Sequence, residues 1–188
     1  MSYQLSKEEL RAGKISKEEF KNLNRNPIYI ILDSLKCAHN IGTILRLADS
    51  LLIKKVYICG NTIVPPNKKI KTSSRGAERW VEFEYVEDIL DVVRKLKSEG
   101  VEITSVEIAD DSINYTEYDP KFPIALVFGR EFDGVSKEVL SKSDKIVHLP
   151  LLGMANSINV STAASVAMYD VYNKLIKKEN ETNSLWSF

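Results

Sequence analysis

A run of small polar side chains follows the last apolar segment and is the first place where the sequence suggests chemistry. Pro150 ends that segment, Gly153 permits a tight turn, and Asn156, Ser157 and Asn159 come next. Small polar residues at a helix start favour N-capping, and the N–H groups there suit a polar ligand. A capped structural helix that binds nothing fits the same run, so this segment alone leaves both interpretations open.

Three segments share one design, in which a predicted buried strand leads into a loop with a glycine and polar groups. They are NIGTILR (residues 40–46), FGREFDG (residues 128–134) and PLLGMANSINVS (residues 150–161). A strand, a glycine-containing loop and a helix start form a common ligand-binding arrangement in α/β proteins. Arg46 and Glu131 add a cation and a carboxylate to this polar set.

Four cations, Lys68, Lys69, Lys71 and Arg75, fall within eight residues. They lie in residues 62–76, which are predicted to form an irregular loop. Such a cluster contacts phosphates in some proteins and is merely a solvated surface in others. Because Lys+Arg and Asp+Glu both total 26, a polyanion would have to bind a local patch of this kind.

The elements that would hold these side chains alternate between apolar strands and amphipathic helices. Strands are predicted at residues 28–32, 55–59, 81–86, 101–108, 123–128 and 145–149. Helices are predicted at residues 41–52, 88–98, 135–140, and from Asn156 or Ser157 to about Lys178. This alternation predicts an α/β fold with a mainly parallel sheet and helices on both faces.

The two ends of the chain are more polar than its middle. Two SKEE sequences, at residues 6–9 and 16–19, fit capping boxes and predict two short helices in an N-terminal extension, residues 1–26. A single domain is expected over residues 27–178, followed by a frayed C-terminal tail, residues 179–188.

Composition and motif searches argue against several classes of protein. Cys37 and Cys59 are too few for a disulfide framework, and with His39 and His148 they lack a zinc-site spacing, so no metal is expected. No G-x-G-x-x-G or P-loop sequence is present, which argues against a nicotinamide oxidoreductase and an NTPase. Without a signal sequence or a long apolar run, we expect no membrane contact and a cytoplasmic location.

Taken in order, the three polar segments resemble the three motifs of the SpoU (TrmH) family of RNA ribose 2′-O-methyltransferases, in the SPOUT superfamily. The resemblance runs from about residue 28 to residue 169 and includes Gly76, Ala77 and Glu78. Ile158 stands where the family usually has leucine. The resemblance implies a deep C-terminal trefoil knot that binds S-adenosylmethionine, and a homodimer.

The resemblance also implies an RNA substrate, either tRNA or rRNA. We expect no separate RNA-binding domain before residue 28. Target choice is therefore expected to depend on the N-terminal segment, on surface loops, on the C-terminal tail or on a partner.

Family similarity further implies roles for individual residues. Arg46 would help the ribose 2′-hydroxyl to lose its proton, either as a base or, because the pKa of arginine exceeds about 12, as a fixed positive charge. Asn40 would hold Arg46 or the ribose, and Glu131 would orient Arg46. Ser157 and Asn159 would position the ligand or the ribose, and both are also compatible with helix capping.

A second set would line the cofactor site with backbone groups and apolar walls. Its members are Val106, Gly129, Leu149, Gly153, Ser157 and Ile158. The four cations would contact RNA phosphates. The alternative function is a non-catalytic RNA- or nucleotide-binding module on the same fold, although binding alone would not require Arg46, Glu131, Ser157 and Asn159 together.

Overall fold

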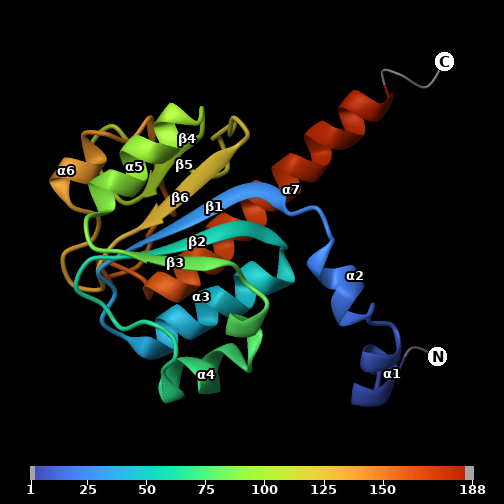
Figure 1. Cartoon of the computed structure of the whole chain (residues 1–188). Helices are drawn as coiled ribbons and strands as arrows, with labels where there is room; N and C mark the ends of the chain where they lie inside the picture. Colours follow the sequence, from blue (N-terminus) through green and yellow to red (C-terminus); the bar gives the residue numbers. More distant parts are fainter. Residues whose placement is uncertain (1–2, 185–188) are drawn as a thin grey trace.

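The computed structural model describes residues 3–184, which contain one seven-stranded sheet with helices on both faces (Figure 1). Every strand pair in it is parallel, and the strand order is β3–β2–β1–β6–β4–β7–β5. The strands are β1 (Asn26–Asp33), β2 (Ile53–Cys59), β3 (Phe83–Val86), β4 (Glu102–Val106), β5 (Ile113–Asn114), β6 (Ile124–Phe128) and β7 (Lys145–His148). The expected α/β fold with a mainly parallel sheet is confirmed.

Apart from the two N-terminal helices, the helices divide between the two faces of the sheet (Figure 1). They are α1 (Lys7–Ala12), α2 (Lys17–Lys21), α3 (Ala38–Ser50), α4 (Lys68–Ser74), the 3-10 helix η1 (Ala77–Arg79), α5 (Ile89–Ser98), α6 (Lys137–Leu140) and α7 (Val160–Ser184). Helices α3, α4 and α7 pack on one face, and α5 and α6 pack on the other. None of the helices within residues 3–184 is long and apolar enough to cross a membrane.

The central strand β1 contributes to two apolar cores because alternate side chains of a strand point to opposite faces. Ile30 and Leu32 pack in the core beneath α3 and α7, whereas Ile31 packs in the core beneath α5 and α6. All three side chains are fully buried. The continuous apolar run in the sequence thus corresponds to a strand covered on both sides.

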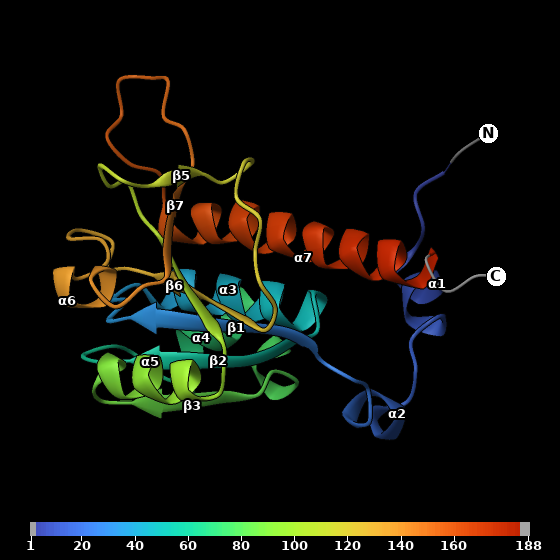
Figure 2. The same cartoon turned by 90° about the horizontal axis from the view of Figure 1, so that it is seen from above.

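The segments that follow β1, β4, β6 and β7 all leave the same edge of the sheet, because the strands are parallel. In open α/β sheets, ligands bind at this carboxyl edge. Figure 2 shows the segment between β7 and α7 as a long loop that extends past β5 before α7 begins. This segment contains the third polar motif found in the sequence.

The cation-rich segment is partly helical, which corrects the predicted irregular loop. Helix α4 covers Lys68, Lys69 and Lys71, and Asn67 caps it by accepting hydrogen bonds from the N–H groups at positions 69 and 70, at 2.9 and 3.2 Å. Ile70 is fully buried. This helix is short and has a single apolar residue, so its sequence shows no repeating pattern of apolar residues from which a helix could be predicted.

The last helix differs from its prediction at both ends. It begins at Val160, because Asn159 accepts the Ser161 N–H at 2.9 Å and acts as the cap, so Asn156 and Ser157 lie in the preceding loop. It continues to Ser184, beyond the expected end near Lys178. Residues 185–188 of the expected tail lie outside the described part of the chain.

The two short N-terminal helices are confirmed, each with a capping box. Ser6 and Ser16 accept N–H hydrogen bonds from Glu9 and Glu19, whose carboxylates accept the serine N–H in return. Both helices stand beside the sheet domain and bury no side chain (Figure 1). Local capping chemistry therefore accounts for this part of the sequence.

Gly42 gives a test of how closely α3 and α4 approach. A Cβ at this position would lie 2.0 Å from the Ser73 Oγ and 2.6 Å from the Ile70 carbonyl oxygen. We expect Gly42→Ala to lower the free energy of unfolding by about 1–2 kcal/mol, because displacing α4 costs more than the gain in helix propensity. Urea denaturation measures this change.

Gly13→Ala is the matched control, because no atom lies within 4 Å of a Cβ built at Gly13. We expect this variant to change the free energy of unfolding by less than about 0.5 kcal/mol. Equal effects of the two substitutions would show that the contact between α3 and α4 does not limit residue size at position 42.

Candidate functional site

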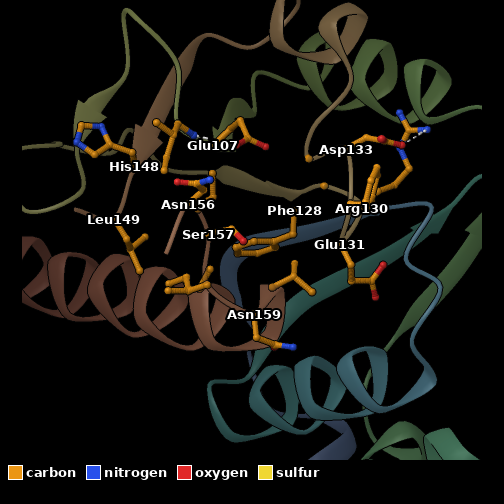
Figure 3. A pocket seen from close by; sticks show the side chains of 18 of the residues that line it. Glu107, Phe128, Arg130, Glu131, Asp133, His148, Leu149, Asn156, Ser157 and Asn159 are labelled. Atoms are coloured by element: carbon orange, nitrogen blue, oxygen red, sulfur yellow. Dashed lines mark hydrogen bonds and ion pairs between the residues drawn. The ribbon is translucent and has the colours of Figure 1, made fainter. Parts of the chain in front are cut away.

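A cavity of about 550 Å³ lies at the carboxyl edge of the sheet, where β4, β6 and β7 end (Figure 3). Its apolar walls come from Val106, Phe128, Leu149, Leu151, Ile158 and Val160. Its polar lining includes Glu107, Glu131, Asp133, His148, Asn156, Ser157 and Asn159. Its volume falls in the usual range for small-molecule sites.

One wall of the cavity is a tight turn over residues 130–134. The backbones of Arg130 and Gly134 exchange two hydrogen bonds, each 3.0 Å long. Gly129 must lack a side chain, since a Cβ there would lie 2.1 Å from the Gly134 carbonyl carbon and the Val135 nitrogen. The glycines of the second motif therefore allow the chain to fold back on itself beside the cavity.

Glu131 joins this turn to the start of α3. Its carboxylate accepts hydrogen bonds from the Lys36 N–H at 3.1 Å, the Cys37 N–H at 3.0 Å and the Asn40 side-chain amide at 3.1 Å. Burial raises the pKa of Glu131, but the hydrogen bonds from Lys36, from its own N–H, from Asn40 and from Cys37 outweigh it and leave the pKa below its ordinary value. Glu131 is therefore ionised at neutral pH.

The charge on Glu131 sets the direction of a longer chain of hydrogen bonds. A carboxylate only accepts, so the Asn40 amide nitrogen faces it and the Asn40 oxygen faces Asn159, which donates at 3.2 Å. The Asn159 oxygen is then directed at Ser161, from which it accepts the N–H and the hydroxyl at 2.9 and 2.7 Å. Asn40 is only 3% exposed. The chain joins all three sequence motifs.

Several residues predicted to bind the cofactor lie together at this cavity. Val106, Gly129, Leu149, Ser157 and Ile158 all line it. The remaining member of that set, Gly153, is not among the lining residues.

Gly153 also does not adopt the unusual backbone conformation that was expected of it. It is absent from the glycines with positive φ, and no atom lies within 4 Å of a Cβ built there. The turn after Pro150 therefore does not require glycine for steric reasons at this position.

Arg46 is not part of the cavity wall. It lies on α3 with its side chain exposed, whereas Asn40 is buried near the start of the same helix. Among residues 3–184, no ion pair or hydrogen bond joins Arg46 to Glu131 or to Asn40. The expected pairing of Arg46 with these two residues is therefore absent.

The predicted RNA-binding cations are exposed on and just after α4. Lys68 and Lys69 line a separate cavity of about 570 Å³, together with Lys36, His39 and other residues at the start of α3. Lys71 and Arg75 do not line it. The structure thus brings two of the four predicted cations together with Lys36, which sequence reasoning had not selected.

Sequence reasoning also missed Glu107, which follows β4 and lines the main cavity. Its carboxylate accepts the Ile108 N–H at 2.9 Å and the Val135 N–H at 2.8 Å, so it ties the turn to β4. His148 was likewise missed, although it is the last residue of β7. Both residues could have been found from their positions in the sequence. A polar side chain at the carboxyl end of a parallel strand lies at the edge of the sheet where ligands bind.

These features define what the cavity can hold. Apolar walls suit a flat ring, polar groups at residues 156–159 suit hydroxyl or amide partners, and the carboxylates of Glu107 and Glu131 suit a positively charged ligand. Among the described residues, no group of three or more His, Cys, Asp or Glu side chains is arranged to hold a metal ion.

Comparison with known proteins gives a family for this arrangement. The SpoU rRNA methylase family model matches residues 27–169. A putative TrmH family tRNA/rRNA methyltransferase of Staphylococcus saprophyticus is 35% identical over 77% of this chain and 58% of its own length. A tRNA (guanosine(18)-2′-O)-methyltransferase of Thermus thermophilus is 29% identical over 85% of this chain and 81% of its own length. The chain thus spans just over half the length of the staphylococcal relative.

Solved structures share the fold. The Aquifex aeolicus TrmH/SpoU tRNA modifying enzyme superposes with a TM-score of 0.75 at 27% identity, covering 87% of this chain and 85% of that one. The SpoU methyltransferase AviRb from Streptomyces viridochromogenes, crystallised with AdoMet, has a TM-score of 0.75 at 21% identity, covering 86% of this chain and 65% of that one. This protein belongs to the SpoU rRNA methylase family.

Proposed function

We propose that this chain is an S-adenosylmethionine-dependent RNA ribose 2′-O-methyltransferase that acts on tRNA or rRNA. The observation that carries the proposal is the hydrogen-bonded chain from Glu131 through Asn40 to Asn159, which joins the three family motifs beside one cavity. The Thermus thermophilus relative, whose name states a 2′-O-methyl transfer to tRNA, supports the reaction type.

The cavity fits the proposed cofactor. Val106, Leu149 and Ile158 supply apolar walls for a flat adenine, and Glu107 and Glu131 supply negative charge for a ligand with cationic groups. AviRb, a structural neighbour crystallised with AdoMet, supports the same assignment. When bound, this group supplies an electrophilic methyl on a sulfonium.

The residues of the chain must then align the ribose and help its proton to leave. We assign Ser157 and Asn159, which line the cavity, to positioning of the ligand or ribose, while Asn159 also caps α7. Glu131 and Asn40 act as positioning residues: their side chains hydrogen-bond one another, Glu131 also accepts backbone N–H groups, and Asn40 accepts from Asn159. Arg46 is assigned to the 2′-oxygen, as a base or as a fixed charge that stabilises the developing alkoxide.

We also propose that the protein is a homodimer with a C-terminal trefoil knot. Leu152 and Met154 are 98% and 100% exposed in a single chain, which supports their burial by a second copy. The insertion of β7 between β4 and β5 returns the chain into an already formed part of the sheet, as a knotted path requires.

Light scattering tests the proposed dimer. It should give about twice the 21.3 kDa mass of one chain, and a monomer at micromolar concentration would contradict the dimer.

The function is tested by two measurements on the same protein. Calorimetry should detect binding of S-adenosylhomocysteine and no binding of NAD. Ribose-methylation mapping in cells that lack the protein should reveal one or more unmethylated positions that purified enzyme restores. Cofactor binding without any methyl transfer would instead favour the alternative, a non-catalytic RNA- or nucleotide-binding module.

Arg46→Ala should reduce kcat for RNA methylation by at least about 100-fold, which is the usual effect of losing a general base or an oxyanion-stabilising group. Affinity for S-adenosylhomocysteine should not change, because Arg46 does not line the cavity. Arg94→Ala, on the opposite face of the sheet, is the control and should retain full activity. Full turnover by Arg46→Ala would remove Arg46 from the mechanism.

The exposed lysines of α4 give a prediction about RNA affinity. Replacing Lys68, Lys69 and Lys71 with alanine should weaken RNA binding, because fewer RNA phosphates are then neutralised. The slope of log affinity against log salt should fall by about 0.7–0.9 for each phosphate that no longer meets a lysine. Cofactor affinity should remain unchanged. Binding titrations at several salt concentrations measure both effects.

A matched control removes the same charge from the opposite edge of the sheet. It replaces three exposed lysines at or near the starts of β2 and β7, namely Lys54, Lys142 and Lys145. We expect this variant to bind RNA like the wild-type protein. If the two triple variants weaken binding equally, net charge rather than the α4 surface determines RNA affinity.

A further inference from the structure

Phe132 is an exposed aromatic side chain beside the candidate site. It is 98% exposed, whereas the other phenylalanines within residues 3–184 are buried or half-buried. Isolated apolar side chains on a surface are common and need no explanation by themselves. The second observation is that Phe132 lines two neighbouring cavities.

Three cavities near the carboxyl edge of the sheet are neighbours, because successive ones share lining residues. Phe132 lines the main cavity and also a neighbouring cavity of about 450 Å³, whose other walls include Lys36 and Cys37. Lys36 and Cys37 in turn line the third cavity with Lys68 and Lys69. An aromatic ring therefore lies between the candidate cofactor site and a group of three lysines.

The backbone beneath Phe132 is held firmly. The two hydrogen bonds between Arg130 and Gly134 close the turn, and Glu131 anchors it to the start of α3. The Arg130 guanidinium also lies 3.5 Å from the Asp133 carboxylate. The neighbours of Phe132 thus make internal contacts, while its ring remains in solvent.

We propose that Phe132 is the stacking surface for a nucleobase in the RNA segment that carries the target ribose. Proteins recognise unpaired RNA by stacking its bases on aromatic rings and by placing cations along its backbone. Here a base stacks on Phe132 while Lys36, Lys68 and Lys69 face the adjoining phosphates. This inference depends on the proposed function, because it requires an RNA substrate.

The test compares position 132 variants in methyl transfer to RNA prepared from cells that lack the protein. Phe132→Ala should raise KM for RNA roughly 5- to 100-fold, as expected when a base loses its aromatic partner, with kcat little changed. Phe132→Tyr should restore the wild-type KM, whereas Phe132→Leu should not, because leucine is apolar but offers no ring. Although Phe132 lines the main cavity, its side chain is 98% exposed, so affinity for S-adenosylhomocysteine should be the same in all variants.

The outcomes separate this inference from the function on which it depends. Absence of methyl transfer by the wild-type protein overturns the proposed function. Transfer by the wild type with an unchanged KM in Phe132→Ala, or full rescue by leucine, overturns the stacking role alone. Loss of S-adenosylhomocysteine affinity would assign the ring to the cofactor, and conversion to a smaller species in light scattering would assign it to an interface between copies.

Discussion

The site depends on the burial of one amide, that of Asn40. Leaving such a group without hydrogen-bond partners costs about 1–3 kcal/mol, so the fold must bring a donor and an acceptor to it. Asn159 supplies the donor and Glu131 the acceptor, although they lie 119 and 91 residues away along the chain. The beginning of α7, the beginning of α3 and the turn after β6 are thereby held in one arrangement, and the cavity forms beside them.

Much of the fold could be predicted from the sequence, since it depends on patterns that span several residues. The apolar runs of β1 and β6 identify buried strands, and two capping boxes identify α1 and α2. Helix α4 was not predicted, because its sequence has no helical periodicity. It packs closely on α3 at Gly42, a contact that only the folded chain shows. The start of α7 was also misplaced, since several neighbouring residues can cap a helix and only tertiary contacts select Asn159.

The sequence predicts many of the residues that form the candidate site but not which of them hydrogen-bond to one another. Glycine and polar side chains after the strands were visible in the sequence, and most of the residues chosen for the cofactor lie at one cavity. Their partners were not visible, because the hydrogen bonds that Glu131 accepts from Asn40 and from the backbone just before α3 depend on strand order. The separation of Arg46 from Asn40 could have been anticipated, because six helical residues amount to a rotation of about 240°.

The position of Arg46 constrains how the proposed reaction can be assembled. Six residues of helix separate it from Asn40 by about 9 Å along the axis of α3, and its side chain is exposed rather than directed into the cavity. Methyl transfer requires the ribose oxygen about 3–3.5 Å from the donated methyl. An arginine that acts on that oxygen must therefore reach it from outside the cavity wall of its own chain. Glu131 is already hydrogen-bonded to Asn40 and to the N–H groups before α3, so in the proposed mechanism the orientation of Arg46 has to come from a group other than Glu131.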